Sequence, residues 1–194
     1  MQNLLAISTT AGCIVAVRAN GKTVIRTNPE RHGLAEYLVP LIKNALAEAG
    51  IGFADLHRIG AVTGPGSFTG LRVGLATAQG LQLALDCELV GITAFDLYRH
   101  GVAGKCAVAL DTLRGDCFSA GYDGEAMWLE PAVRMLNEIQ AMNVPVYGDL
   151  PFATKPDDAQ LADSLLALTV ISAAPATPYY LREAEISKPK TVVA

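Results

Sequence analysis

The chain of 194 residues is poor in charged and aromatic side chains, which make up 18% and 6% of the sequence. About a quarter of the residues of a soluble protein are usually charged, so the shortage favours some apolar surface left over for a partner. The net charge of −4 argues against a broad basic surface, and we expect any contact with RNA to be made through another subunit. Hydrophobic residues, at 51%, are ample for a packed core.

Signals for metal binding, secretion and membrane insertion are also missing. The four cysteines form no C-x-x-C pair and do not cluster with the three histidines, so we expect neither a zinc site nor disulfides. The amino terminus has no basic leader before a long apolar run, and no segment reaches about 18 uninterrupted apolar residues. We therefore expect a reduced, cytoplasmic protein without membrane contacts.

The first hundred residues alternate between strand-like and helix-like patterns. Short apolar runs predict strands at 4–8, 13–18 and 23–27, and Asn20-Gly21 predicts a hairpin between the last two. An amphipathic pattern predicts a helix over 34–49, kinked at Pro40. The next three segments predict a βαβ unit with parallel strands: a strand at 58–63, a helix at 70–85 and a strand at 88–92.

The second half repeats this order in a shortened form. Its expected elements are strands at 106–111 and 117–122, a helix at 133–142, a strand at 144–147 and a helix at 161–168. The pattern therefore predicts an α/β protein whose second lobe is abbreviated. We place the first lobe at residues 1–100 and the smaller lobe, with an irregular tail after Ala173, at 101–194.

A glycine-rich turn links the predicted strand at 58–63 to the helix at 70–85. Backbone amides at the start of a helix favour an anion, so a phosphate could lie at this turn. The candidate residues are Gly64, Gly66, Ser67, Thr69 and Gly70. Tight packing alone explains such glycines equally well, because the turn matches neither a Walker loop nor a Rossmann fingerprint and no lysine follows it.

The helix after the turn is apolar nearly all round and carries two rows of small residues. Gly70, Gly74 and Ala78 form one row; Ala76, Gly80 and Ala84 form the other. Such a helix must be buried on more than one side. One side can be its own sheet, and the other needs either a neighbouring helix of the same chain or a second protein.

The run Gly64-Pro-Gly-Ser-Phe-Thr-Gly-Leu-Arg-Val-Gly-Leu-Ala-Thr-Ala-Gln-Gly-Leu is highly specific. Together with Leu4-Leu-Ala-Ile, Arg31-His32 and Tyr180-Leu-Arg, it resembles the TsaB family of bacterial tRNA threonylcarbamoyladenosine biosynthesis proteins. The resemblance is firm over residues 1–93 and thinner afterwards. It implies a two-lobed actin-like, sugar-kinase-like (ASKHA) fold.

The resemblance also implies partners. In that family the helices of the first lobe bind TsaD, the catalytic paralogue, and a small ATPase, TsaE, joins the pair. The implied interface residues are Leu34, Leu38, Leu41, Leu71, Gly74, Leu75, Ala78 and Leu81. Transfer RNA would be reached only through the complex, and the same apolar surface would suit a homodimer when the partner is missing.

Catalytic and metal-binding residues are not evident in this sequence. The paralogue carries a metal-binding His-x-x-x-His, and the corresponding positions hold Ala94 and Tyr98, which cannot ligate as imidazole does. Ser8 replaces the Asp that holds magnesium in actin-like ATPases. Asp111 and Asp116 could imitate a second phosphate hairpin, although Asp beside Gly115 is typical of turns. We expect no tightly bound cofactor, with ATP and Mg²⁺ entering only at the level of the complex.

Two functions from different classes therefore stay open. The first is a non-catalytic scaffold subunit, without independent activity, that is required for threonylcarbamoyl transfer to the adenosine next to the tRNA anticodon. The second is an autonomous actin-like ATPase or small-molecule kinase. A peptidase would need a nucleophile that the sequence does not reveal, because Ser67 lacks the G-x-S-x-G spacing.

Overall fold

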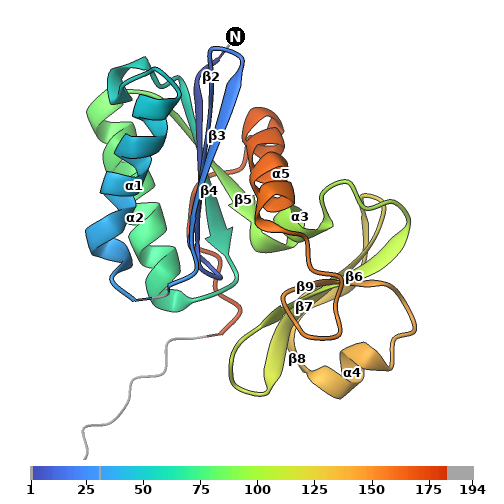
Figure 1. Ribbon diagram of the computed structural model, residues 1–194. Helices are drawn as coiled ribbons and strands as arrows, with labels where there is room; N and C mark the ends of the chain where they lie inside the picture. Colours follow the sequence, from blue (N-terminus) through green and yellow to red (C-terminus); the bar gives the residue numbers. More distant parts are fainter. Residues whose placement is uncertain (1, 31, 183–194) are drawn as a thin grey trace, which may run out of the picture.

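The computed structural model describes residues 2–30 and 32–182, which form two β-sheets with helices packed around the first (Figure 1). The first sheet has the strand order β3-β2-β1-β4-β5. Its strands are β1 (Leu4–Ser8), β2 (Cys13–Ala19), β3 (Lys22–Asn28), β4 (Arg58–Gly64) and β5 (Glu88–Thr93). The first three strands pair antiparallel, whereas β4 and β5 run parallel to β1. This arrangement confirms the βαβ unit predicted from the sequence.

Helices cover both faces of the first sheet. On one face lie α1 (Leu34–Glu48) and α2 (Phe68–Leu85); on the other lie α3 (Ala94–Arg99) and α5 (Asp158–Ile171) (Figure 1). The alternation of β1 explains the two layers, because Leu5 and Ile7 join the core under α1 and α2, whereas Leu4 and Ala6 join the core on the opposite face. A short 3₁₀ turn, η1 (Phe53–Asp55), precedes β4.

The second sheet repeats the order of the first. Its strands are β6 (Lys105–Asp111), β7 (Asp116–Asp123), β8 (Ala126–Met135) and β9 (Val146–Gly148), arranged β8-β7-β6-β9, and α4 (Leu136–Gln140) connects β8 to β9. Three antiparallel strands, a helix and a parallel strand therefore occur twice. The repeat was predicted, but without the third strand of the second copy, β8. The second copy is shorter, with no counterpart of β5 among the described residues.

The last helix returns to the first sheet. Gly60 in β4 faces Thr169 of α5 so closely that a β-carbon on Gly60 would lie 2.0 Å from the Oγ1 atom of Thr169. Thr169 is fully buried, and its hydroxyl donates to the carbonyl of Leu165 at 2.7 Å. A glycine is therefore needed where α5 crosses β4. The second half of the chain thus supplies a helix that covers the first sheet.

The helix predicted at 133–142 is wrong in its first turn. Residues up to Met135 belong to β8, and α4 covers only Leu136–Gln140. The strand was missed because its pairing with β7 is irregular at two places, which breaks the alternation that marks a strand in a sequence.

The predictions also missed α3, which is only six residues long. Pro40 lies within α1, which runs unbroken from Leu34 to Glu48.

Residues after α5 form an extended segment without regular structure up to Arg182, as predicted for the tail. The segment follows β5 and then passes the end of β4. Residues 183–194, including Pro189, lie outside the described part of the chain, as does Arg31. Across residues 2–30 and 32–182, every helix is too short or too polar to cross a membrane.

Candidate functional site

The glycine-rich turn packs directly against the β1–β2 hairpin. Ser67 is the N-cap of α2: its Oγ accepts a hydrogen bond from the Gly70 amide at 3.2 Å, and its own amide donates to the Thr10 carbonyl at 3.1 Å. A β-carbon on Gly66 would lie 2.5 Å from the Thr10 β-carbon, and one on Gly70 would lie 2.1 Å from the Thr9 carbonyl oxygen. These glycines therefore allow a close approach of turn and hairpin.

The five candidate anion-binding residues lie together at the start of α2, but they do not share one environment. Gly64 is buried, and a β-carbon there would lie 2.6 Å from the Tyr179 carbonyl oxygen. The amides of Ser67 and Gly70 already donate within the chain. Gly66 and Ser67 line a pocket, and Thr69 is exposed. Close packing accounts for the glycines, and anion binding stays a prediction.

The pocket beside the glycine-rich turn has a volume of about 370 Å³ and lies between the two lobes. We call it the turn pocket. Its walls come from the turn, from the β6–β7 hairpin and from the tail: Pro65, Gly66, Ser67, Phe68, Asp111, Thr112, Leu113, Arg114, Phe118, Tyr179, Tyr180, Leu181 and Arg182. Four aromatic side chains line it together with two arginines and the acidic Asp111, so the lining is partly apolar and partly charged.

Asp116 connects the β6–β7 hairpin to the tail. Its carboxylate accepts hydrogen bonds from the Thr112 hydroxyl and from the Arg182 guanidinium. These two donors, the threonine first, hold the pKa of Asp116 below its usual value despite partial burial. Asp116 therefore has a structural partner in the tail, which the spacing of the sequence did not reveal.

A second pocket, of about 290 Å³, lies between the β1–β2 hairpin and the second lobe. We call it the hairpin pocket. Ser8, Thr10, Gly12 and Cys13 line it from the first lobe, and Asp111, Asp149, Lys155 and Asp158 line it from the second half of the chain. The first hairpin thus contributes hydroxyls but no carboxylate.

Two of the acidic side chains in the hairpin pocket bind backbone amides. Asp111 Oδ1 accepts from the Leu113 amide at 2.7 Å, and Asp149 Oδ1 accepts from the Asp111 amide at 2.7 Å. The first contact is local and typical of an Asp-stabilised turn, whereas the second joins the end of β6 to the segment after β9. In the described part of the chain, histidine, cysteine and acidic side chains form no group of three that could hold a metal ion.

The positions that correspond to the paralogue's histidine pair serve the core instead. Ala94 and Tyr98 lie one turn apart on α3, are 0% and 5% exposed, and pack with Leu161 and Leu165 of α5 in one cluster. His100 follows α3 and is exposed. Both side chains are therefore part of the core, and neither supplies the imidazole that a metal site would need.

The predicted partner surface is largely buried within this chain. Leu34, Leu38, Leu71, Gly74, Leu75 and Ala78 are buried, and Leu41 and Leu81 are half-buried. The row formed by Gly70, Gly74 and Ala78 faces the chain's own sheet and hairpin, because a β-carbon on Gly74 would lie 2.2 Å from the Oγ1 atom of Thr9. Six of the eight predicted interface residues are therefore used by the intramolecular core of this chain.

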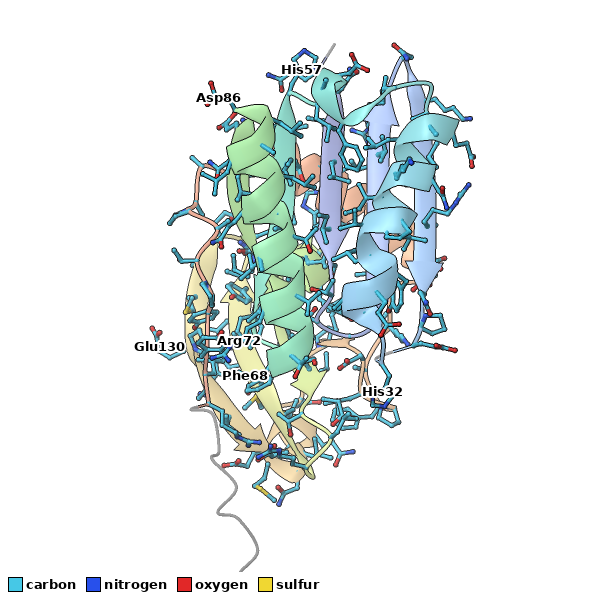
Figure 2. The ribbon with its side chains drawn as sticks, turned by 90° about the vertical axis from the view of Figure 1, so that its left-hand side faces the viewer. His32, His57, Phe68, Arg72, Asp86 and Glu130 are labelled. Atoms are coloured by element: carbon cyan, nitrogen blue, oxygen red, sulfur yellow. The ribbon has the colours of Figure 1, made fainter. Side chains whose placement is uncertain are left out.

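The other row of small residues lies on the outside of α2. Ala76, Gly80 and Ala84 are exposed, no atom lies within 4 Å of a β-carbon built on Gly80, and Leu83 beside them is 85% exposed. Figure 2 shows α1 next to α2, and on α1 Val39 and Pro40 are also exposed. We call these six residues the outer face: Val39, Pro40, Ala76, Gly80, Leu83 and Ala84.

Comparison with known proteins supports one family. The family model for TsaD, tRNA N6-adenosine threonylcarbamoyltransferase, matches residues 29–133. The tRNA threonylcarbamoyladenosine biosynthesis protein TsaB of Escherichia coli K12 is 30% identical over 135 residues, which are 64% of this chain and 58% of that protein. An uncharacterised protein of Mycobacterium tuberculosis H37Rv is 31% identical over 143 residues, covering 72% of this chain and 68% of the relative.

Solved structures agree on the fold. A crystal structure from Pseudomonas aeruginosa, described as an uncharacterised protein with similarity to the peptidase YeaZ, superimposes with a TM-score of 0.73 at 23% identity and covers 94% of this chain and 100% of that one. YeaZ from the same organism gives a TM-score of 0.70 at 22% identity, covering 93% and 100%.

The fold is thus the actin-like, sugar-kinase-like α/β fold predicted from the sequence, with its repeated strand order. The chain spans little more than half the length of the E. coli relative, at 58%. The family model matches more than half of the present chain. The chain therefore belongs to the TsaD family of tRNA N6-adenosine threonylcarbamoyltransferases, within which it is TsaB-like, or YeaZ-like.

Proposed function

We propose that this chain is a non-catalytic subunit in the biosynthesis of threonylcarbamoyladenosine in tRNA, and that it acts by binding the catalytic paralogue TsaD through its outer face. Its E. coli relative carries the name of that pathway, and its family model is that of the transferase. Ala94 and Tyr98, where the paralogue would present metal-binding histidines, support a role outside the chemistry.

The single observation that carries the proposal is the exposure of Leu83. Its side chain is 85% exposed near the carboxyl end of α2, beside the row of small residues in which Gly80 leaves open space. Small residues on an exposed helix let a neighbouring helix come close, and a protruding leucine fills a pocket on that neighbour. On α1, Val39 is 45% exposed and extends the apolar area.

Charges border this apolar area. Arg72 lies towards the amino end of α2 (Figure 2). On α1, Glu36 and Lys43 are exposed. An apolar centre with a polar rim is typical of a protein interface. The same area would suit a homodimer of this chain in the absence of the paralogue. The small ATPase TsaE and the tRNA would then join through the complex, since the net charge of −4 disfavours direct RNA binding.

The proposal is tested by measuring binding of the purified chain to TsaD from the same organism by calorimetry. Leu83→Arg should weaken binding at least tenfold, about 1.4 kcal/mol, because it replaces the most exposed apolar side chain of the proposed interface with a charge. Val170→Arg is the matched control: Val170 is 47% exposed on α5, which covers the opposite face of the sheet. Equal affinities for the native chain and Leu83→Arg would refute the proposed surface.

The alternative, an autonomous ATPase or small-molecule kinase, rests on the hairpin pocket. Asp111 and Asp149 lie there, between the lobes of an actin-like fold. If the isolated chain hydrolysed ATP in the presence of Mg²⁺ and lost this activity in Asp111→Asn, the alternative would replace the scaffold role. We expect no turnover, because the first hairpin has Ser8 where such enzymes use a carboxylate.

A further inference from the structure

Residues 173–182 follow α5 and run along the edge of the first sheet. We call them the strap. The Gly91 amide of β5 donates to the Ala174 carbonyl at 2.7 Å, and the Tyr179 amide donates to the Thr63 carbonyl of β4 at 2.7 Å. Between these two bonds Ala176 is buried, and its carbonyl accepts from the Gln79 side chain of α2 at 3.3 Å. The strap is therefore attached to the first lobe at several points.

Glycines allow the strap to lie this close. A β-carbon on Gly91 would lie 2.4 Å from the Pro175 carbonyl oxygen, and one on Gly64 would lie 2.6 Å from the Tyr179 carbonyl oxygen. Gly64 also has a φ of +112°, which side chains rarely adopt. Gly64 is the first residue of the glycine-rich run. At least one glycine of that run is therefore needed for the close packing of the strap.

The strap then reaches the amino end of α2. The Tyr180 ring lies 5.2 Å from the Phe68 ring, between centroids, and its hydroxyl accepts from Arg72 Nε at 3.4 Å. The Arg72 guanidinium in turn lies 3.8 Å from the centre of the Phe68 ring. Figure 2 shows Phe68 and Arg72 at this end of the helix.

At its far end the strap contacts the second lobe. The Arg182 guanidinium donates to the Asp116 carboxylate in β7 and lies 6.0 Å from the centre of the Phe118 ring. The side chains of Arg182 and Asp116 are only 25% and 20% exposed, so solvent screens the pair less than it would screen one on an open surface. The strap thus connects the ends of β4 and β5 to the β6–β7 hairpin.

We propose that the strap is a conformational device that fixes the β6–β7 hairpin against the glycine-rich turn, and that the Arg182–Asp116 ion pair is its latch. Tyr179 to Arg182 form one wall of the turn pocket, and the hairpin forms another. While the latch is closed, the pocket keeps its shape, and Tyr180 of the strap stays packed on Phe68 and Arg72 at the start of α2. When it opens, the tail wall is released and the pocket becomes a groove.

The proposal is tested by amide hydrogen exchange on the isolated full chain, observed by NMR at residues Tyr179 and Gly91. Arg182→Ala and Asp116→Asn should each speed exchange of the Tyr179 amide about tenfold, because each removes a hydrogen bond between charged groups that holds the segment. Their combination should add little, because either change alone opens the same latch. Exchange at Gly91 should rise less, since it is attached further from the latch.

Glu125→Gln is the matched control. Glu125 also forms an ion pair with the first lobe, with Arg99 of α3 at 3.0 Å. Its removal should leave the Tyr179 amide unchanged. Two results would overturn the proposal: exchange at Tyr179 that stays within twofold of the native rate in both latch variants, or an equal rise at the β1 amides, which would mean general destabilisation. Neither depends on whether the chain binds TsaD.

Discussion

Gly74 lies against Thr9 so closely that the β-carbon of an alanine at position 74 would be 2.2 Å from the threonine Oγ1 atom. Thr9, at the tip of the β1–β2 hairpin, is only 4% exposed. The contact determines which side of α2 faces inward. The row of Gly70, Gly74 and Ala78 packs on the hairpin and sheet, and the row of Ala76, Gly80 and Ala84 faces away from them.

A pair of glycine-to-alanine substitutions tests this orientation. Gly74→Ala should lower the free energy of unfolding by about 1–3 kcal/mol, because overpacking against Thr9 outweighs the gain in helix propensity. Gly80→Ala has open space and should raise it by about 0.5–1 kcal/mol. Urea unfolding of both variants measures the difference. If both substitutions stabilised the protein equally, the inward row would be misassigned.

A second test concerns the crossing of α5 over β4. Gly60→Ala should destabilise the protein by about 2–3 kcal/mol, since its β-carbon would lie within 2.9 Å of three Thr169 side-chain atoms. Adding Thr169→Gly should recover part of this loss, because the two positions share one contact. A double-mutant cycle by thermal or urea unfolding gives the coupling. Additive losses would argue against the packing of α5 on this sheet.

The latch residue Asp116 gives a pH-dependent prediction. Its pKa is held below the usual value near 3.8, so the folded state binds the proton more weakly than the unfolded state does. Its contribution to stability should therefore be complete above that value and decline as the pH falls through the lower, folded-state pKa. At pH 7, Asp116→Asn should cost about 1 kcal/mol.

The measurement is urea unfolding of the native chain and of Asp116→Asn at pH 7 and near pH 2–3. Other carboxylates titrate in both proteins and cancel in the difference. We expect the difference to shrink at low pH. A difference that grows as the pH falls would contradict the assignment of the ion pair.

Thiol reactivity tests the packing of a core in each lobe, because Cys13 lies in the core of the first lobe and Cys117 in that of the second. Burial raises the pKa of Cys13 and of Cys117 to about 11, so both thiols should stay protonated and unreactive at pH 8 in the folded chain. Cys87 is only half-buried and should react first with an aromatic disulfide reagent, followed by mass spectrometry. Cys87→Ser should remove the fast phase. Rapid labelling of Cys13 or Cys117 in the folded chain would show that these cores are open.

The fold was predictable from the sequence to the extent that each element carried a local pattern. The short apolar run of β1, the Asn20-Gly21 hairpin and the amphipathic α1 all have such patterns, and the structure confirms them. The strand β8 does not, because its register with β7 shifts at Ser119 and Gly121. Irregular pairing is determined by the neighbouring strand, which a single sequence pattern cannot report.

The surface assignment failed for a similar reason. Both rows of small residues on α2 were evident, but their burial depends on Thr9, which lies some sixty residues upstream. A usable signal was present: Arg72 and Gln79 are polar and share the helical face of Ala76 and Leu83, and this face is exposed. The contact of Arg182 with Asp116 joins positions 66 residues apart and had no local signal.

The proposed role as a subunit of the transferase is tested most directly by reconstituting threonylcarbamoyl transfer to tRNA with purified TsaD and TsaE, in the presence and absence of this chain. The account predicts that transfer requires the native chain, that Leu83→Arg lowers the rate at least tenfold at equal subunit concentrations, and that Val170→Arg does not. Transfer at the same rate without the chain, or undiminished transfer with Leu83→Arg, would contradict it.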